Sequence, residues 1–240
     1  NYLMTFRMWN SDERINEILE NPASLFYMLT PGEKKQFISQ TSFAGFRKND
    51  FVFREGEKPA GFMVLVSGKV KIFKEGVGGR EQILRMSKPM GIIGFRALFA
   101  GENHIASAVT IEDSVVSNTS YDFILNTGLK NSEFSLGIIR QLACELGFSN
   151  SRTVALTQKH IRGRLAESLV LLAGKYGFED DGLTLKVYIS REDLANLSNM
   201  TTSNAIRTLS GFANENLITM DGRKIKILDL YRLDRISKLG

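Results

Sequence analysis

Cysteine and histidine are scarce in this 240-residue chain, which contains one cysteine, Cys144, and two histidines, His104 and His160. A single thiol cannot form an internal disulfide, which fits a reducing compartment, so the cytoplasm is the expected location. One cysteine and two histidines also cannot supply a complete zinc or iron–sulfur site within one chain. We therefore expect no metal-ligating residues, no catalytic residues and no enzyme activity.

Long apolar runs are absent as well. No run reaches the roughly 18 residues that a membrane-spanning helix needs, and no signal-peptide pattern opens the chain. We therefore expect no membrane partner. The first residue is Asn1 and not methionine, so a short stretch is expected to precede it.

Positive charge is unevenly placed. Residues 1–149 hold 17 Lys/Arg against 16 Asp/Glu, whereas residues 150–240 hold 14 against 10, within a net charge of +5. A basic C-terminal part suits a polyanionic partner such as nucleic acid. An ordinary solvated basic surface explains the charge alone equally well.

Short strand patterns dominate the first half of the chain. Residues 10–45 look helical, with amphipathic pieces at 12–19 and 31–37. From Phe46 to about Ser120, alternating apolar segments recur between glycines, which favour turns. Such a series predicts a sandwich or barrel, here a double-stranded β-helix of the jelly-roll or β-roll type.

A heptad seam follows the strands. Ile139, Leu142 and Leu146 begin it, and polar residues continue it at alternating spacings of three and four residues. Such a helix can pack on its own β-domain or pair with a second copy of the chain. About 25 residues without proline would project past a small β-roll, which favours pairing through a long dimerisation helix.

Helix-capping and turn signals define the C-terminal part. After a helical pattern at 158–175 and an alternating strand at 183–189, Ser190 is typical of the start of a short helix, and Thr201 can cap the next one. Asp221-Gly222 between two apolar segments is a strong hairpin signal. The order predicts a winged helix-turn-helix.

The predicted fold is therefore α+β. Its predicted divisions are a β-roll domain with N-terminal helices that senses an effector (residues 1–130), a dimerisation helix (131–157) and a winged helix-turn-helix that binds DNA (158–240).

The second helix of the helix-turn-helix has two distinct faces. Its inward stripe is apolar, whereas Ile206 and Arg207 fall on the opposite stripe among small polar residues. Arg207 is the best candidate for a bidentate contact to guanine, and Ile206 can cover a thymine methyl group. The predicted DNA-binding residues are Thr201, Thr202, Ser203, Asn204, Ile206, Arg207 and Ser210, with Arg223 and Lys224 on the wing.

Residues 189–195 and 200–209 resemble the helix-turn-helix of the Crp/Fnr family of transcription regulators. Arg207 matches the arginine of that motif, and Ser203 replaces its common glutamate, which implies a different half-site. Residues 162–169 resemble the family's helix after the hinge, and residues 53–57 together with 62–72 resemble its β-roll. The resemblance implies a homodimeric transcription regulator that binds a two-fold symmetric site on double-stranded DNA, responds to an effector in the β-roll and works with RNA polymerase.

The family's cyclic-nucleotide cassette is altered in this chain. Phe95 stands where the family has a glutamate for the ribose, and Ile105 stands where it has an arginine for the cyclic phosphate. An apolar pair can neither accept from a ribose hydroxyl nor neutralise a phosphate, which argues against cyclic AMP. The predicted effector-pocket residues are Phe95, Arg96, His104, Ile105 and Ser107, although Arg96 and His104 fit surface positions in a loop better.

Other cofactors fit the sequence poorly. Gly94-Phe95-x-Ala97 resembles the oxygen-sensing branch of the family, but its iron–sulfur cluster needs several cysteines and only Cys144 is present. Haem stays open, with His104 or His160 as an axial ligand. A lone histidine is more commonly a surface or packing residue.

Three rival functions compete with a ligand-gated regulator. A β-roll enzyme would need a cluster of histidine and carboxylate ligands. A winged-helix protein that does not bind DNA would lack the steep salt dependence of DNA binding. A constitutive DNA-binding regulator with a vestigial pocket has the same sequence features as a ligand-gated regulator. Activators and repressors share these features as well.

Overall fold

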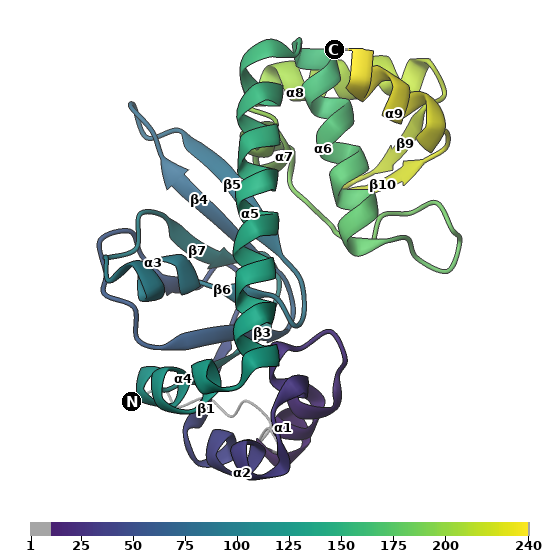
Figure 1. Cartoon of the computed structure of the whole chain (residues 1–240). Helices are drawn as coiled ribbons and strands as arrows, with labels where there is room; N and C mark the ends of the chain where they lie inside the picture. Colours follow the sequence, from purple (N-terminus) through teal and green to yellow (C-terminus); the bar gives the residue numbers. More distant parts are fainter. Residues whose placement is uncertain (1–10, 240) are drawn as a thin grey trace, which may run out of the picture. The chain divides into compact units, whose positions relative to one another are not determined.

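The computed structural model describes residues 11–239, which form a mixed α+β chain of two compact units (Figure 1). The first unit comprises the described residues up to Lys74 together with Arg85–Leu146. The second comprises Glu75–Leu84 and the residues from Gly147 onward. The α+β fold class, with its β-roll, long helix and helix-turn-helix, is confirmed.

Two four-stranded sheets form the β-roll. Their strand orders are β1-β8-β3-β6 and β2-β7-β4-β5, so neighbouring strands are often far apart in sequence, as in a jelly roll. For example, β1 and β8 pair antiparallel with Thr41 opposite Thr119. The strands are β1 Thr41–Phe46, β2 Phe51–Phe53, β3 Phe62–Ser67, β4 Val70–Glu75, β5 Glu81–Ser87, β6 Ile92–Ile93, β7 Ser107–Thr110 and β8 Ser114–Thr119.

Gly68 shows why glycine is required at one of the turns. Its φ is +90°, and a Cβ there would come within 2.2 Å of the Ser114 side chain. Only glycine therefore lets β3 turn into β4 beside the start of β8.

Aromatic packing joins the N-terminal helices to the β-roll. The rings of Phe26 and Phe37 lie 4.3 Å apart, and Phe26 lies 5.4 Å from Phe134 of the long helix. Thr30 forms a complete capping box with Glu33 at the start of the helix predicted at 31–37. The remaining elements of this region are α1 Ser11–Glu20, η1 Leu25–Met28, α2 Pro31–Ser39, α3 Phe95–Ala100, α4 Tyr121–Asn126 and η2 Gly128–Lys130.

The long helix α5 runs from Ser132 to Gln158, a length of 27 residues. Near its start, Phe134 and Ile138 are buried in the core of the first unit. Further along, the side chains of the predicted seam face solvent, with exposed fractions of 61% for Ile139, 37% for Leu142 and 64% for Leu146. No helix among residues 11–239 is long and apolar enough to cross a membrane.

The C-terminal unit encloses a core of fully buried leucines and Phe212. Its last helix, α9, packs against α6, and its two strands pair antiparallel with Ile227 opposite Ile218. The elements are α6 Ile161–Tyr176, α7 Arg191–Leu197, α8 Thr202–Asn214, β9 Ile218–Asp221, β10 Lys224–Ile227 and α9 Leu230–Leu239.

The continuous strand expected over residues 183–189 is wrong in its extent. Thr184 and Leu185 form isolated bridges only, with Lys226 and Phe178 respectively. The backbone N–H of Lys186 donates to the carbonyl of Gly177, and residues 186–189 form no strand or bridge. Val187 and Ile189 are nevertheless buried, so the apolar alternation reflects burial and not strand pairing.

Candidate nucleic-acid interface

Side-chain caps set the start of both helices in the helix-turn-helix. The Ser190 hydroxyl accepts from the backbone N–H of Asp193 at 2.9 Å, and the Thr201 hydroxyl accepts from that of Asn204 at 3.2 Å. Between the helices, Asn199 adopts a φ of +49°, a left-handed conformation that asparagine tolerates. The predicted caps and turn are therefore confirmed, and they define where α8 begins.

The two faces of α8 differ in burial as the sequence predicted. Ala205, Leu209 and Phe212 are fully buried. Ile206 is 49% exposed, and the other members of the outer stripe are exposed too, namely Ser203, Arg207 and Ser210. A helix with one face anchored and the other presenting short side chains around a longer cation has the form that enters a major groove.

Arg207 is available for an external contact. Among residues 11–239, no hydrogen bond or ion pair engages its guanidinium group, so a surface salt bridge does not account for its presence. An unpaired guanidinium on the exposed stripe can reach a base edge or a phosphate.

The N-terminal turn of α8 suits an anion. Thr201 and Thr202 are exposed and Asn204 is half-buried. The Thr201 hydroxyl already caps one backbone N–H, while the remaining amides and the helix dipole favour a phosphate near this end.

The wing carries the second group of candidates. Arg223 and Lys224 are exposed at and just after the hairpin turn. Neither forms an ion pair within the described part of the chain, and Lys224 Nζ lies 5.8 Å from the ring centroid of Tyr188. Both cations can therefore contact a phosphate backbone.

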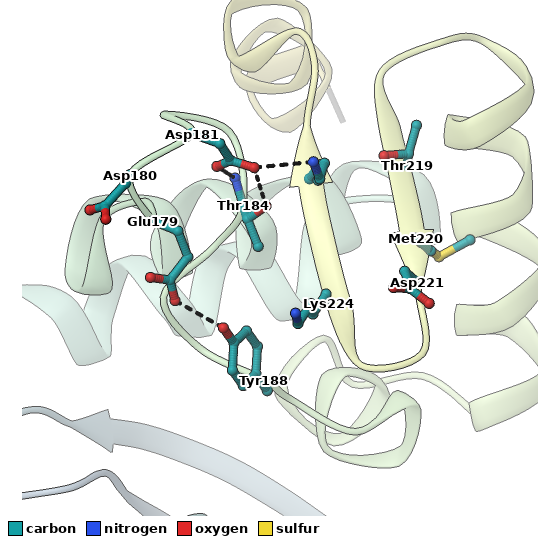
Figure 2. A pocket seen from close by; sticks show the side chains of 10 residues that line it. Glu179, Asp180, Asp181, Thr184, Tyr188, Thr219, Met220, Asp221 and Lys224 are labelled. Carbon is teal, nitrogen blue, oxygen red and sulfur yellow. Dashed lines mark hydrogen bonds and ion pairs between the residues drawn. The ribbon is translucent and has the colours of Figure 1, made fainter.

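A groove of about 470 Å³ lies beside the wing, on the side that Figure 2 shows. The Thr184 hydroxyl donates a hydrogen bond to the carboxylate of Asp181, which also forms an ion pair with Lys226 at 3.1 Å. These hydrogen bonds, of which that from Thr184 has the largest effect, keep the pKa of Asp181 well below its usual range. Nearby, the Tyr188 hydroxyl donates to Glu179 at 3.0 Å. The acidic loop therefore neutralises the charge of Lys226 within the chain, whereas Lys224, which lines the same groove, has no ion-pair partner among the described residues.

Arg191, which the sequence analysis did not select, joins the first helix to the wing. It is the first residue of α7, and its Nη2 donates to the carbonyl of Gly222 in the wing turn at 2.7 Å. Its Nη1 is buried without a hydrogen-bond partner among the described residues, and burial lowers the pKa of the group. A cation at a helix N-terminus opposes the helix dipole, and this position was the available signal that Arg191 has another task.

The predicted effector-pocket residues do not share one environment. Phe95 is buried in the core of the first unit, whereas Ile105 is 51% exposed. Arg96 pairs with Glu102 at 2.9 Å, and the Ser107 hydroxyl accepts from the Glu55 backbone N–H. These side chains therefore differ in burial and in their partners, although the positive charge of Arg96 acts on His104.

The surface position expected for His104 is wrong. The side chain is only 4% exposed, because its ring stacks on Phe53, a residue that is distant in sequence. Its Nε2 is buried without a hydrogen-bond partner among the described residues, and burial lowers its pKa. Neutral imidazole is the form that binds iron, but the ring stacks on Phe53 and lies so close to Gly94 that a Cβ there would come within 2.8 Å of it, so haem would have to displace these contacts.

No group of three histidine, cysteine or carboxylate side chains suited to a metal ion occurs in the described part of the chain. Cys144 is a free, exposed thiol.

Comparison with known proteins identifies both parts of the chain. Residues 44–128 match the cyclic nucleotide-binding domain, and residues 163–236 match the Crp-like helix-turn-helix domain, which together cover about two thirds of the chain. A CRP-like cAMP-activated global transcriptional regulator of Mycobacterium tuberculosis is 28% identical over 93% of this chain and 100% of its own length. The transcriptional activator protein Anr of Pseudomonas protegens is 24% identical over 78% of this chain and 77% of its own length.

A solved structure with the same fold is FixK2 from Bradyrhizobium japonicum. It matches with a TM-score of 0.73 at 22% identity and covers 82% of this chain and 96% of its own. A β-roll followed by a winged helix-turn-helix with a free outer stripe defines a DNA-binding transcription regulator. The chain belongs to the Crp/Fnr family, whose members bind DNA and typically act as dimers.

Proposed function

We propose that the protein is a homodimeric, sequence-specific transcription regulator without enzymatic activity, which binds double-stranded DNA at a two-fold symmetric site. The observation that carries the proposal is the outer stripe of α8, where Arg207 and Ile206 are exposed on a helix whose opposite face is fully buried. RNA polymerase as a further partner and the cytoplasm as the location follow from this class of protein.

The exposed seam of α5 supports the dimer. Ile139, Leu142 and Leu146 are exposed in the single chain although they repeat at heptad spacing. Pairing of two such helices would bury them and give the assembly a two-fold axis. Two recognition helices related by that axis would meet half-sites about 34 Å apart on one face of the DNA.

Arg85 supports gating by an effector in the β-roll. This β5 residue forms an ion pair with Glu145 of α5, and its Nη2 donates to the carbonyl of Ile92 at 3.2 Å. Its guanidinium also lies 5.8 Å from the ring centroid of Phe95. A ligand that displaced Phe95 would thus disturb a contact that ends one residue before the seam leucine Leu146.

The effector is proposed to differ from cyclic AMP. The Mycobacterium tuberculosis relative is described as cAMP-activated. In this chain the positions for a ribose acceptor and a phosphate cation are held by Phe95, which is buried, and Ile105, which carries no charge. The single cysteine likewise argues against an iron–sulfur cluster within one chain. A constitutive regulator with a vestigial pocket is the second candidate, because the predicted pocket residues face different environments.

In vitro selection from random duplex DNA tests this proposal. The ligand-free protein, the Arg207→Ala variant and the protein with added cyclic AMP are compared. We expect the wild-type protein to enrich a two-fold symmetric motif, the variant to lose preference at one base pair of each half-site, and cyclic AMP to change neither result. A motif that strengthens when a metabolite extract is added supports gating by an effector, whereas a motif of unchanged strength supports the constitutive alternative.

A motif that appears only with cyclic AMP contradicts the proposed effector class. Failure to enrich any motif, at low salt and with metabolite extracts added, contradicts sequence-specific binding. A DNA-binding protein shows a steep dependence of its affinity on salt concentration. A shallow dependence would favour the rival function, a winged helix that binds protein.

A further inference from the structure

Arg152 is a buried cation in the C-terminal half of α5. Arg152 is only 7% exposed, and its Nη2 donates to the backbone carbonyl of Leu197. Leu197 is the last residue of α7, the first helix of the helix-turn-helix. The carbonyl end of a helix carries partial negative charge, so the guanidinium meets the end of α7 that attracts it.

The surroundings of Arg152 leave this carbonyl as its principal partner. Nη1 is buried without a hydrogen-bond partner among the described residues. Burial lowers the pKa of Arg152, and the negative charge of Glu167 on α6 opposes that shift. Glu167 is itself engaged by Lys159 at 3.3 Å. A buried arginine held this incompletely is a costly choice for stability alone, since an apolar side chain could fill the same space.

The next residue along the chain is anchored as well. The hydroxyl groups of Ser198 and Ser168 lie 2.8 Å apart, and both residues are fully buried. Consecutive residues at the end of α7 are thus held by two different helices, Leu197 by α5 and Ser198 by α6. The turn begins at this point, and α8 starts at Thr202. The two contacts therefore fix the position from which α8, the proposed recognition helix, begins.

We propose that Arg152 is a positioning residue for DNA recognition, which locks the helix-turn-helix onto the C-terminal half of the long helix. This inference rests on the proposed function, because it assigns to Arg152 the task of keeping two recognition helices at one separation in the dimer. It differs from the role of Arg207, which reads bases and has no part in the separation. Its substitution should therefore alter the tolerance for half-site spacing and leave base preference unchanged.

The first test needs no DNA. Amide hydrogen exchange is measured at residues 197–200 in the wild-type protein, in Arg152→Met, which keeps an apolar stem, and in Arg140→Met, a matched control at an exposed arginine of the same helix. We expect exchange at these amides to become at least about tenfold faster in Arg152→Met and to stay unchanged in Arg140→Met. Unchanged exchange in Arg152→Met overturns the proposed lock.

The second test uses DNA with the selected half-site alone or as a pair whose spacing changes in single base-pair steps. The wild-type protein should prefer one spacing, and Arg152→Met should bind the neighbouring spacings nearly as well while its affinity for a single half-site is retained. Arg152→Lys keeps a cationic donor and should restore part of the preference. If Arg152→Met does not fold, the comparison of Arg152→Lys with the wild-type protein decides.

The outcomes separate the two proposals. A wild-type protein that selects no site contradicts the proposed function, and the exchange measurement then judges Arg152 by itself. A wild-type spacing preference that persists in Arg152→Met overturns the positioning role even where DNA recognition holds.

Discussion

The imidazole ring of His104 lies flat against the phenyl ring of Phe53, with ring centroids 3.8 Å apart and 13° between the ring planes. Burial lowers the pKa of His104; the negative charge of Glu57 opposes this shift, and the positive charge of Arg96 adds to it. The folded protein therefore favours the neutral ring. An unfolded histidine titrates near about pH 6.5, so below that pH the unfolded chain binds the proton more readily.

This stack predicts an acid-sensitive stability. The contribution of His104 is present above the unfolded pKa and is lost as the pH falls from that value through the lower folded pKa. We expect the wild-type free energy of unfolding, measured with denaturant, to fall more between about pH 7.5 and about pH 5.5 than that of His104→Phe. His160→Gln, at an exposed histidine, is the control and should behave as the wild-type protein does. An equal fall in His104→Phe would show that another group governs the acid response.

The two faces of α8 predict opposite effects of truncation. Phe212 is fully buried and Ile206 is 49% exposed. Phe212→Ala should lower the free energy of unfolding by about 3–5 kcal/mol, whereas Ile206→Ala should change it by less than about 0.5 kcal/mol. Thermal and chemical denaturation measure both. A large loss in Ile206→Ala would place that side chain in the core and remove it from the proposed base-reading stripe.

The seam of α5 predicts a charge-sensitive dimer. Burial of one leucine stabilises an interface by about 1.5–3 kcal/mol, and a two-fold axis applies each substitution twice. Leu146→Glu should therefore shift the protein to monomers in sedimentation equilibrium at micromolar concentration. Val154→Glu, at a position 52% exposed on the same helix but outside the seam, should stay dimeric. A dimeric Leu146→Glu protein would locate the interface elsewhere.

The wing predicts a graded salt dependence. Lys224 has no ion-pair partner within the described residues, whereas Lys226 is paired with Asp181 at 3.1 Å. Lys224→Ala should weaken binding equally across DNA sequences and reduce the slope of log K against log salt by about 1. Lys226→Ala is the matched control and should leave the slope nearly unchanged.

Arg207→Ala should weaken binding to the specific site by about 1–3 kcal/mol and relax the preference at one base position.

The parts of the fold that depend on neighbouring residues could be predicted from the sequence. The caps at Ser190 and Thr201 and the hairpin turn at Asp221-Gly222 are local signals, because each capping hydroxyl bonds to an amide three residues away. The two faces of α8 follow from helical periodicity in the same way. These local features locate most of the candidate DNA-binding surface.

The parts that depend on distant partners could not be predicted. The sequence predicts a surface position for His104, because the residues next to it in the chain do not indicate that its ring stacks on Phe53. Arg152 and Arg191 each donate a hydrogen bond to a backbone carbonyl more than 30 residues away. Every residue has such a carbonyl, so the sequence does not indicate which one an arginine contacts. The apolar alternation at residues 183–189 predicted a strand, whereas the buried side chains are held by packing with little strand pairing.

The separation of α8 into an anchored face and a free face has an evolutionary consequence. Ser203, Ile206 and Arg207 can change without disturbing Ala205, Leu209 or Phe212, which hold the helix in place. A duplicated copy of this regulator could thus acquire a new set of promoters through one or two point mutations while keeping its fold. The same freedom makes the protein a scaffold for orthogonal switches, in which the reading surface is exchanged and the rest of the chain is left as it is.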